Sequence, residues 1–270
     1  MKKIILLVIL SGMAMAAAGQ LTETRTVSGF TGISASSAFD ITVTKGTAES
    51  LVVTADENIM PHVRSEVLGG VLKLYLDRLP RNTNVKNLKA AVTVKELETV
   101  KLSGACKLAS DAVFTPAEFE AGISGASSLQ LTVETGKLSI EASGACKITL
   151  DATVKGKAEF DLSGGSKLQS KLRADRLEMD ISGACRVELS GSANEAFFDL
   201  SGASKIEADN LLLQEATVKA SGASWVEVHS EKFLSVRSSG ATTVLHKGNP
   251  TVTDIKSGGY FFSKKSKKIE

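Results

Sequence analysis

Basic side chains with a constant spacing are the residues of this chain that are best suited to binding chemistry. Four residues after all but one of the first six Ser-Gly-Ala or Ser-Gly-Gly motifs stand basic residues, Lys107, Lys147, Lys167, Arg186 and Lys205, and the next repeat has the only tryptophan, Trp225, at that position. Cations in a row attract acidic groups, and an exposed indole ring can stack on a sugar. The pattern therefore predicts a stripe that binds an acidic glycan through Lys147, Lys167, Arg186, Lys205 and Trp225.

Acidic side chains recur beside these cations and allow a second interpretation. Glu188, Glu207 and Glu227 follow two positions further on, and Asp161, Asp180 and Asp199 stand two positions before the motif. Like charges on neighbouring strands repel, and opposite charges relieve that repulsion. The charges can therefore be compensating ladders that keep a surface soluble, with Trp225 shielding the end of the stack.

Motifs for catalysis or for metal binding are missing from the sequence. It contains no Gly-x-Ser-x-Gly elbow, His-Glu-x-x-His pair, EF-hand loop or glycine-rich phosphate loop. The three histidines, His62, His229 and His246, have no evident serine–acid partners and are expected to be ordinary surface or strand residues. We predict no catalytic residue, no metal ligand and no cofactor.

An internal repeat positions all of these side chains. The motif begins at Ser103, Ser124, Ser143, Ser163, Ser182, Ser201 and Ser221, and a Ser-Gly-Ala-Thr variant begins at Ser239. Successive motifs are 18 to 21 residues apart, a period typical of stacked repeats. Polar and apolar residues alternate on both sides of each motif, as in Phe160-Asp161-Leu162. Alternation with a period of two predicts strands with one buried face, so each motif is a bend between two strands.

These strands are predicted to form an all-β, right-handed, single-stranded parallel β-helix with about 20 residues per coil. A meander of hairpins would show turn signals every 8–12 residues or so. A helix–strand repeat would need a helical period in each unit, and segments such as 151–157 are too short and too mixed for that. The handedness follows from the strong preference of parallel crossovers for the right-handed form.

The predicted stacking also determines how far apart the three cysteines lie. Cys106, Cys146 and Cys185 all occupy the fourth motif position, on alternate coils. Residues two coils apart are about 9–10 Å apart along the stack. A disulfide needs Cα atoms closer than about 7 Å. We therefore predict no disulfide, and small buried thiols in place of serine.

The N-terminus predicts export. Lys2 and Lys3, an apolar run at 4–10 and small residues up to Ala18 are typical of a signal peptide, predicted at residues 1–18. The run is shorter than the roughly 20 residues of a membrane span, and no later span is predicted. Without the predicted signal peptide the chain has 30 basic and 30 acidic residues, so its net charge does not indicate nucleic-acid binding.

The mature chain divides into three predicted segments. Residues 19–100 are less regular and are expected to begin and cap the β-helix, with a small separate β domain as the alternative. Residues 101–250 hold the repeat, and residues 251–270 hold a C-terminal strand and a basic, solvated tail.

The motif ladder also carries a resemblance. Together with the opening segment from Gly29 to Gly46, the segment from Val53 to Val63 and Leu72-Lys73-Leu74, it resembles the putative autotransporter adhesin, head GIN domain family. That family is a domain of unknown function common in Bacteroidetes. The likeness spans about residues 27–250. It implies a pectate-lyase-like β-helix and an extracytoplasmic location, and it transfers no catalytic residue.

Taken together, the sequence predicts an exported, non-catalytic, adhesin-like binding module of the cell envelope. It would be periplasmic, secreted or on the cell surface. Its partner would be a polysaccharide or an envelope or host protein, bound along the regular side of the β-helix. Two alternatives stay open. One is a polysaccharide lyase or hydrolase, which only analogy with other β-helices supports. The other is a structural envelope spacer.

Overall fold

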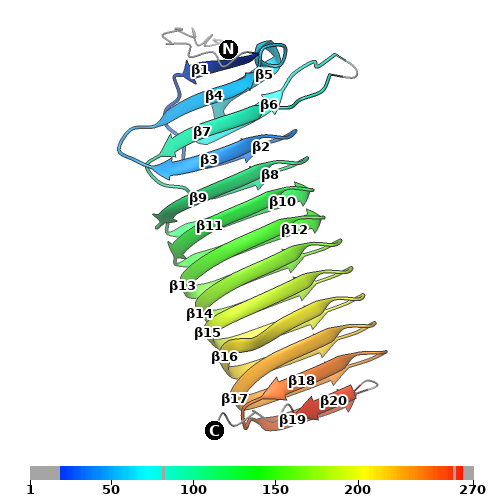
Figure 1. Ribbon diagram of the computed structural model, residues 1–270. Coiled ribbons are helices and arrows are strands. Elements are labelled where there is room, and N and C mark those ends of the chain that lie inside the picture. The colour runs from blue at the N-terminus through cyan, green and yellow to red at the C-terminus, as the bar shows by residue number, and fades with distance from the viewer. Residues whose placement is uncertain (1–18, 81–82, 258–259, 264–270) are drawn as a thin grey trace, which may run out of the picture.

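A single stack of coils makes up the part of the protein that the structure describes. The structure is a computed structural model, and it describes residues 19–80, 83–257 and 260–263. Figure 1 shows an elongated molecule with the N-terminal strands at one end and the C-terminal strands at the other. All of its strands belong to one hydrogen-bonded array. The predicted signal peptide at 1–18 and the basic tail at 264–270 lie outside the described residues.

The repeat body coils on itself with a regular step. Its strands are β8 (Thr99–Leu102), β9 (Lys107–Phe114), β10 (Glu118–Gly125), β11 (Ser128–Thr135), β12 (Lys137–Gly144), β13 (Lys147–Leu162), β14 (Lys167–Ile181), β15 (Arg186–Leu200), β16 (Lys205–Ala220), β17 (Trp225–Ser238), β18 (Thr243–Lys247), β19 (Thr251–Ser257) and β20 (Tyr260–Ser263). Glu118 pairs with Lys137 and Ser128 with Lys147, both in parallel and both 19 residues later. The coils wind in the right-handed sense (Figure 1), and the predicted all-β parallel β-helix is confirmed.

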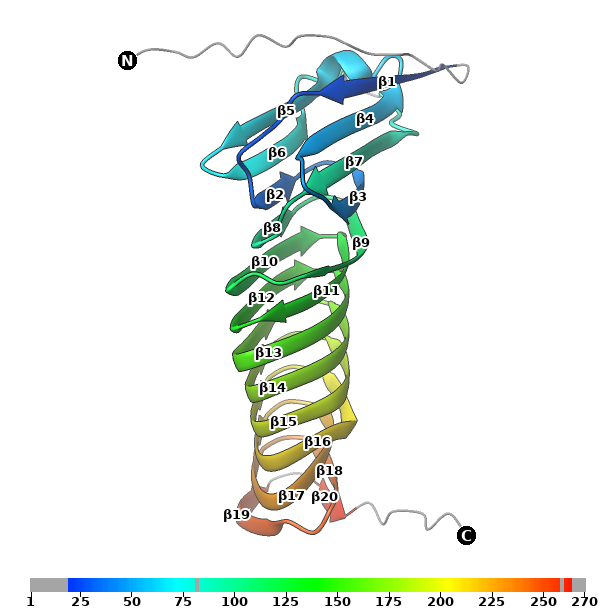
Figure 2. The ribbon, with the colours of Figure 1, turned by 90° about the vertical axis from the view of Figure 1, so that its left-hand side faces the viewer.

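Each coil has two extended sides joined by two corners (Figure 2). Face A contains the strand segments that lead into a Ser-Gly corner: β8, β10, β12, the second halves of β13 to β17, and β19. Face B contains the segments that leave that corner: β9, β11, the first halves of β13 to β17, β18 and β20. Inward residues of both faces, such as Leu150 from face B and Phe160 from face A, share one buried core. Outward residues therefore form straight columns along each face.

The Ser-Gly corner depends on a left-handed residue in every coil. Gly183 has a φ of 83°, and the following amide, Ala184 N, donates to the Gly164 carbonyl of the previous coil at 2.7 Å. A Cβ on Gly183 would lie 2.5 Å from that carbonyl oxygen, so only glycine stacks here without strain. In the first coil Ser37 takes this position, with a φ of 82°, and accepts the equivalent hydrogen bond from Ala105 N.

The fourth corner position forms a buried column of serine and cysteine. All three cysteines are free and buried, and Ser127 lies between Cys106 and Cys146 in the stack. The Cys146 thiol donates to the Ser143 carbonyl at 3.2 Å, and the Ser166 hydroxyl donates to the Ser163 carbonyl at 3.0 Å. Thiol and hydroxyl thus close the same corner. Burial raises the pKa of all three thiols, which keeps them protonated and unreactive.

The N-terminal strands extend both faces and then reverse direction. They are β1 (Gln20–Arg25), β2 (Gly32–Ala35), β3 (Asp40–Lys45), β4 (Ser50–Asp56), β5 (Val63–Leu68), β6 (Val71–Leu76) and β7 (Leu88–Val94), with a 3-10 helix, η1 (Met60–His62). β2 and β3 pair in parallel with β8 and β9, so they form the first coil. Beyond β6 and β7 the pairs β5–β6, β4–β7 and β1–β4 are antiparallel.

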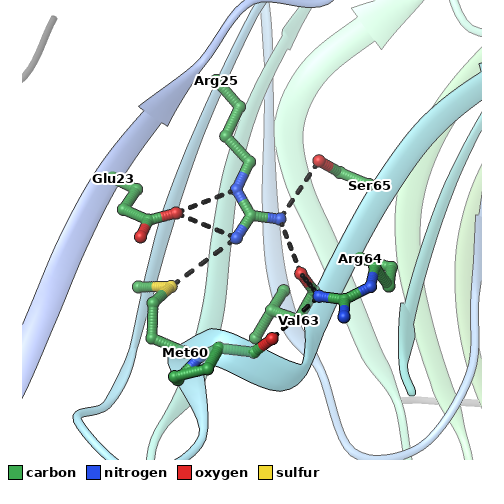
Figure 3. Close-up of polar contacts among 7 residues, drawn as sticks. Glu23, Arg25, Met60, Val63, Arg64 and Ser65 are labelled. Atoms are coloured by element: carbon green, nitrogen blue, oxygen red, sulfur yellow. Dashed lines mark hydrogen bonds and ion pairs between the residues drawn. The ribbon is translucent and has the colours of Figure 1, made fainter. Parts of the chain in front are cut away.

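One arginine ties this reversed end together. The Arg25 guanidinium donates to the Val63 carbonyl at 3.1 Å and to Ser65 Oγ at 3.2 Å, and it pairs with Glu23 at 3.0 Å (Figure 3). Its side chain is 13% exposed, so these contacts are largely shielded from water. Arg25 therefore joins β1 to β5, the outermost strands of the two faces.

Candidate binding surface

The predicted stripe is a straight column on face B. Lys147, Lys167, Arg186, Lys205 and Trp225 pair rung by rung through β13 to β17. We call these five residues the basic column. Successive rungs of a parallel sheet are about 4.8 Å apart, so neighbouring cations are held close together by the backbone itself. The fold therefore brings together all the residues that the sequence singled out.

The basic column has two electrostatically different halves. Arg186 pairs with Glu188 at 3.2 Å and with Glu207 at 2.9 Å, and Lys205 pairs with Glu207 at 2.7 Å. The hydrogen bond from Lys205 lowers the pKa of the Glu207 carboxyl, so this network stays ionised near neutral pH.

The upper half of the column, Lys147 and Lys167, differs from the lower half, which contains Arg186 and Lys205. Lys147 and Lys167 make no ion pair with any other described residue. Compensation of charge thus applies to the lower half of the column, and the upper half presents two adjacent free ammonium groups.

A groove of about 740 Å³ lies beside the column on face B. Its neutral polar lining includes Gln130, Thr149, Gln169 and Asn210. Its charged lining consists of five acidic side chains, Asp111, Asp151, Glu188, Glu207 and Asp209, and two basic ones, Lys171 and Arg186. Its lining residues come from β9, β11 and β13 to β16, so it follows the axis of the stack. The sequence contains these polar residues at outward positions, and the stacked strands bring them together along one groove. The groove was missed by reasoning from the sequence.

Trp225 ends the basic column with an oriented ring. Its indole Nε1–H donates to Glu227 Oε1 at 3.1 Å, and 38% of the residue is exposed. The outward position in β17 places the ring at the surface, and the hydrogen bond to Glu227 restrains its orientation there.

The predicted acidic positions two residues before the motif lie on the opposite side of the molecule, whereas those two residues after the cations lie on face B. Glu141, Asp161, Asp180 and Asp199 form a continuous column on face A, which we call the acidic column. Burial raises the pKa of Asp180, and the neighbouring charges of Asp199 and Asp161 raise it further. No ion pair joins the acidic column to the basic column within the described part of the chain. Of the predicted acidic residues, Glu188 and Glu207 on face B form ion pairs with the basic column.

The histidines do not converge on a site. His229 contacts Glu231 at 2.9 Å, and His62 contacts the Asp77 carbonyl at 3.0 Å. His246 is buried in β18, and burial lowers its pKa. Among residues 19–80, 83–257 and 260–263, no group of three or more His, Cys, Asp or Glu side chains is arranged to hold a metal ion. In the same residues, no helix has the length and apolar character needed to cross a membrane.

A right-handed parallel β-helix with an elongated polar groove defines the class of this protein. Its sequence matches the family model described as "Putative auto-transporter adhesin, head GIN domain" over residues 29–171 and 151–250. The chain belongs to that family, as the motif ladder predicted. No curated protein matches it.

Solved structures share the fold over almost the whole chain. A putative adhesin from Parabacteroides merdae is 21% identical, with a TM-score of 0.74, covering 92% of this chain and 97% of its own. A putative lipid binding protein from Parabacteroides distasonis is 20% identical, with a TM-score of 0.71 and the same coverage. A putative adhesin from the same organism is 22% identical, with a TM-score of 0.70, covering 91% of this chain and 94% of its own. Identities this low show a common fold and leave the ligand open.

Proposed function

We propose that this protein is an exported, non-catalytic binding module of the cell envelope, and that face B binds an extended acidic polysaccharide. One observation carries the proposal: Lys147 and Lys167 stand on successive coils and make no ion pair with a described residue. The groove beside them is lined by more carboxylates than cations, so the acidic groups of the ligand lie on the column and its hydroxyls face the groove. Ammonium groups form strong, charge-assisted hydrogen bonds with carboxylate or sulfate groups. The signal-peptide pattern at residues 1–18 and the family's description as an adhesin head support export and a binding role.

The repeat favours a polymer as the ligand. The coil step of about 4.8 Å is close to the length of one pyranose unit, so a polysaccharide parallel to the stack meets an equivalent position at each unit. Gln130, Thr149 and Gln169 form one such column inside the groove and can exchange hydrogen bonds with sugar hydroxyls. The sheet holds these groups in place before binding, which reduces the entropy lost on association.

The experiment measures binding of the full mature chain to an array of acidic and neutral polysaccharides and host matrix proteins. The test variant is Lys147→Gln/Lys167→Gln. The matched control is Lys137→Gln/Lys155→Gln, which removes the same charge from face A and from the second corner. We expect the wild type and the control to bind acidic polysaccharides, and the test variant to bind at least about tenfold more weakly, with a smaller salt dependence.

The alternatives give different results. If the wild type binds no glycan and no matrix protein, the protein is a spacer and the proposal is wrong. Release of unsaturated sugars from an acidic polysaccharide would instead identify a lyase. Binding to a matrix protein alone, unaffected by Lys147→Gln/Lys167→Gln, would overturn the polysaccharide assignment.

A further inference from the structure

The outward column that contains the cations continues into aromatic residues at the C-terminal end. Below Lys205 its rungs are Trp225, Thr243 and Tyr260. Phe262 is the next outward residue of β20, and its ring stacks on that of Tyr260, with centroids 6.2 Å apart and planes 8° from parallel. We call Trp225, Tyr260 and Phe262 the aromatic shelf.

Tyr260 and Phe262 occupy outward positions of β20, and both residues are exposed. Tyr260 is 66% exposed and Phe262 is 55% exposed. Alternation along β20 places both on the outside of face B, in register with Thr243 and Leu245 of β18. Grouped aromatic residues on a surface mark a binding site more often than isolated ones do.

We infer that the aromatic shelf is a subsite for pyranose rings of the same polysaccharide chain whose acidic groups the basic column binds. The inference rests on the proposed function, and it adds Tyr260 and Phe262 to the sugar stacking that the sequence predicts for Trp225. The C–H face of a pyranose is apolar and packs on an aromatic ring, while its hydroxyls stay in water. Continuity supports this occupant, because the shelf lies in the same outward column as Lys147 and Lys167 and in the column next to it.

The spacing sets the minimum length of the ligand. Six coil steps separate Lys147 from Tyr260, or roughly 29 Å at about 4.8 Å per step. Trp225 and Tyr260 are two steps apart, about 10 Å, which is the distance between alternate units of an extended polysaccharide. An oligosaccharide of about six or more units can therefore contact both regions, and a shorter one can contact only one.

The variants separate stacking from charge. Tyr260→Ala/Phe262→Ala removes the lower part of the shelf, and Trp225→Ala removes the upper part. Phe233→Ala is the matched control, because Phe233 is 47% exposed but lies on face A of β17. The probes are polygalacturonate, heparin and hyaluronate, together with methyl-esterified polygalacturonate, which keeps the rings and loses the charge.

We expect the shelf variants to bind the acidic polymers roughly tenfold more weakly at every salt concentration, and Phe233→Ala to bind like the wild type. Methyl-esterified polygalacturonate should depend on the shelf and not on the two lysines. Because Trp225 is the only tryptophan, its fluorescence in the unmutated protein should change when oligosaccharides of about six units bind, which is a readout independent of any variant.

Two failures are distinguishable. If the wild type binds none of the acidic polymers, the proposed function is wrong and the inference is wrong with it. If the wild type binds and Lys147→Gln/Lys167→Gln weakens binding, but the shelf variants bind like Phe233→Ala and the Trp225 fluorescence stays constant, only the inference is overturned.

Discussion

The repeat body and the N-terminal cap close the same β-helix by different means. In the body, each Ser-Gly corner repeats one backbone hydrogen bond to the coil above, as between Ala184 N and the Gly164 carbonyl. In the cap, strands reverse direction and single side chains make contacts that occur once, as Arg25 does. The repeat body therefore requires one residue type at a recurring position, whereas the cap requires particular residues at single positions.

The strongest test of the repeated constraint uses two adjacent glycines. Gly164 has a φ of 76°, and a Cβ there would lie 2.7 Å from the Gly144 carbonyl oxygen. Gly165 has open space around its Cα, at the position where other corners have alanine. We expect Gly164→Ala to lower the free energy of unfolding by about 2–4 kcal/mol, from left-handed strain plus steric overlap.

Gly165→Ala is the control, and it should raise the free energy of unfolding by up to about 1 kcal/mol by restricting the unfolded chain. Urea denaturation of both variants checks the pair. Equal destabilisation by the two substitutions would show that the corner is not held by stacking of its left-handed residues.

The cap should respond locally to the loss of one side chain. Arg25→Met removes the guanidinium that donates to the Val63 carbonyl and to Ser65 Oγ, and it leaves the Glu23 carboxylate without this ion pair. We expect a loss of about 1.5–3 kcal/mol, with faster amide hydrogen exchange in β1 and β5 and unchanged exchange in β14 and β15. Arg78→Met is the control, because the Arg78 side chain is 91% exposed. Faster exchange throughout the body would contradict a local role.

The same contrast explains what could be predicted from the sequence. The register of Lys147 with Lys167 follows from the repeat, because the Ser-Gly motif sets it again in every coil. The partner of Arg25 could not be predicted, since Val63 is 38 residues away and the contact occurs once. The two halves of the basic column were not predicted. The sequence does carry a signal for them, because the residue two positions after Arg186 and Lys205 is a glutamate and the one after Lys147 and Lys167 is not.

The first Ser-Gly corner lies between the cap and the repeat body, and a substitution there should increase the stability of the fold. Ser37 occupies the left-handed position that glycine fills in the later corners. Ser37→Gly relieves strain of about 1–2 kcal/mol and costs roughly 0.5–1 kcal/mol in unfolded-state entropy. We expect a net gain of about 0.5 kcal/mol in the free energy of unfolding. Ser36→Gly, at a residue without a positive φ, should instead be destabilising, and a gain from both would refute the strain argument.

The smallest expected effect comes from the acidic column, where the stacking of like charges destabilises the folded state. Burial and the charges of Asp199 and Asp161 raise the folded-state pKa of Asp180 above its ordinary 3.8. The folded state therefore binds a proton more readily than the unfolded chain just above pH 3.8. In that range the free energy of unfolding falls as pH rises through the raised pKa.

Asp180→Asn removes this cost, because the amide keeps the shape and carries no charge. Since Asp180 is exposed to solvent, which screens the repulsion, we expect a gain of only a few tenths of a kcal/mol at pH 7. Denaturation over a series of pH values should show the gain shrinking below pH 3.8, where the wild-type carboxyl is protonated in both states. A gain that is independent of pH would mean that packing, and not repulsion within the acidic column, distinguishes the variant.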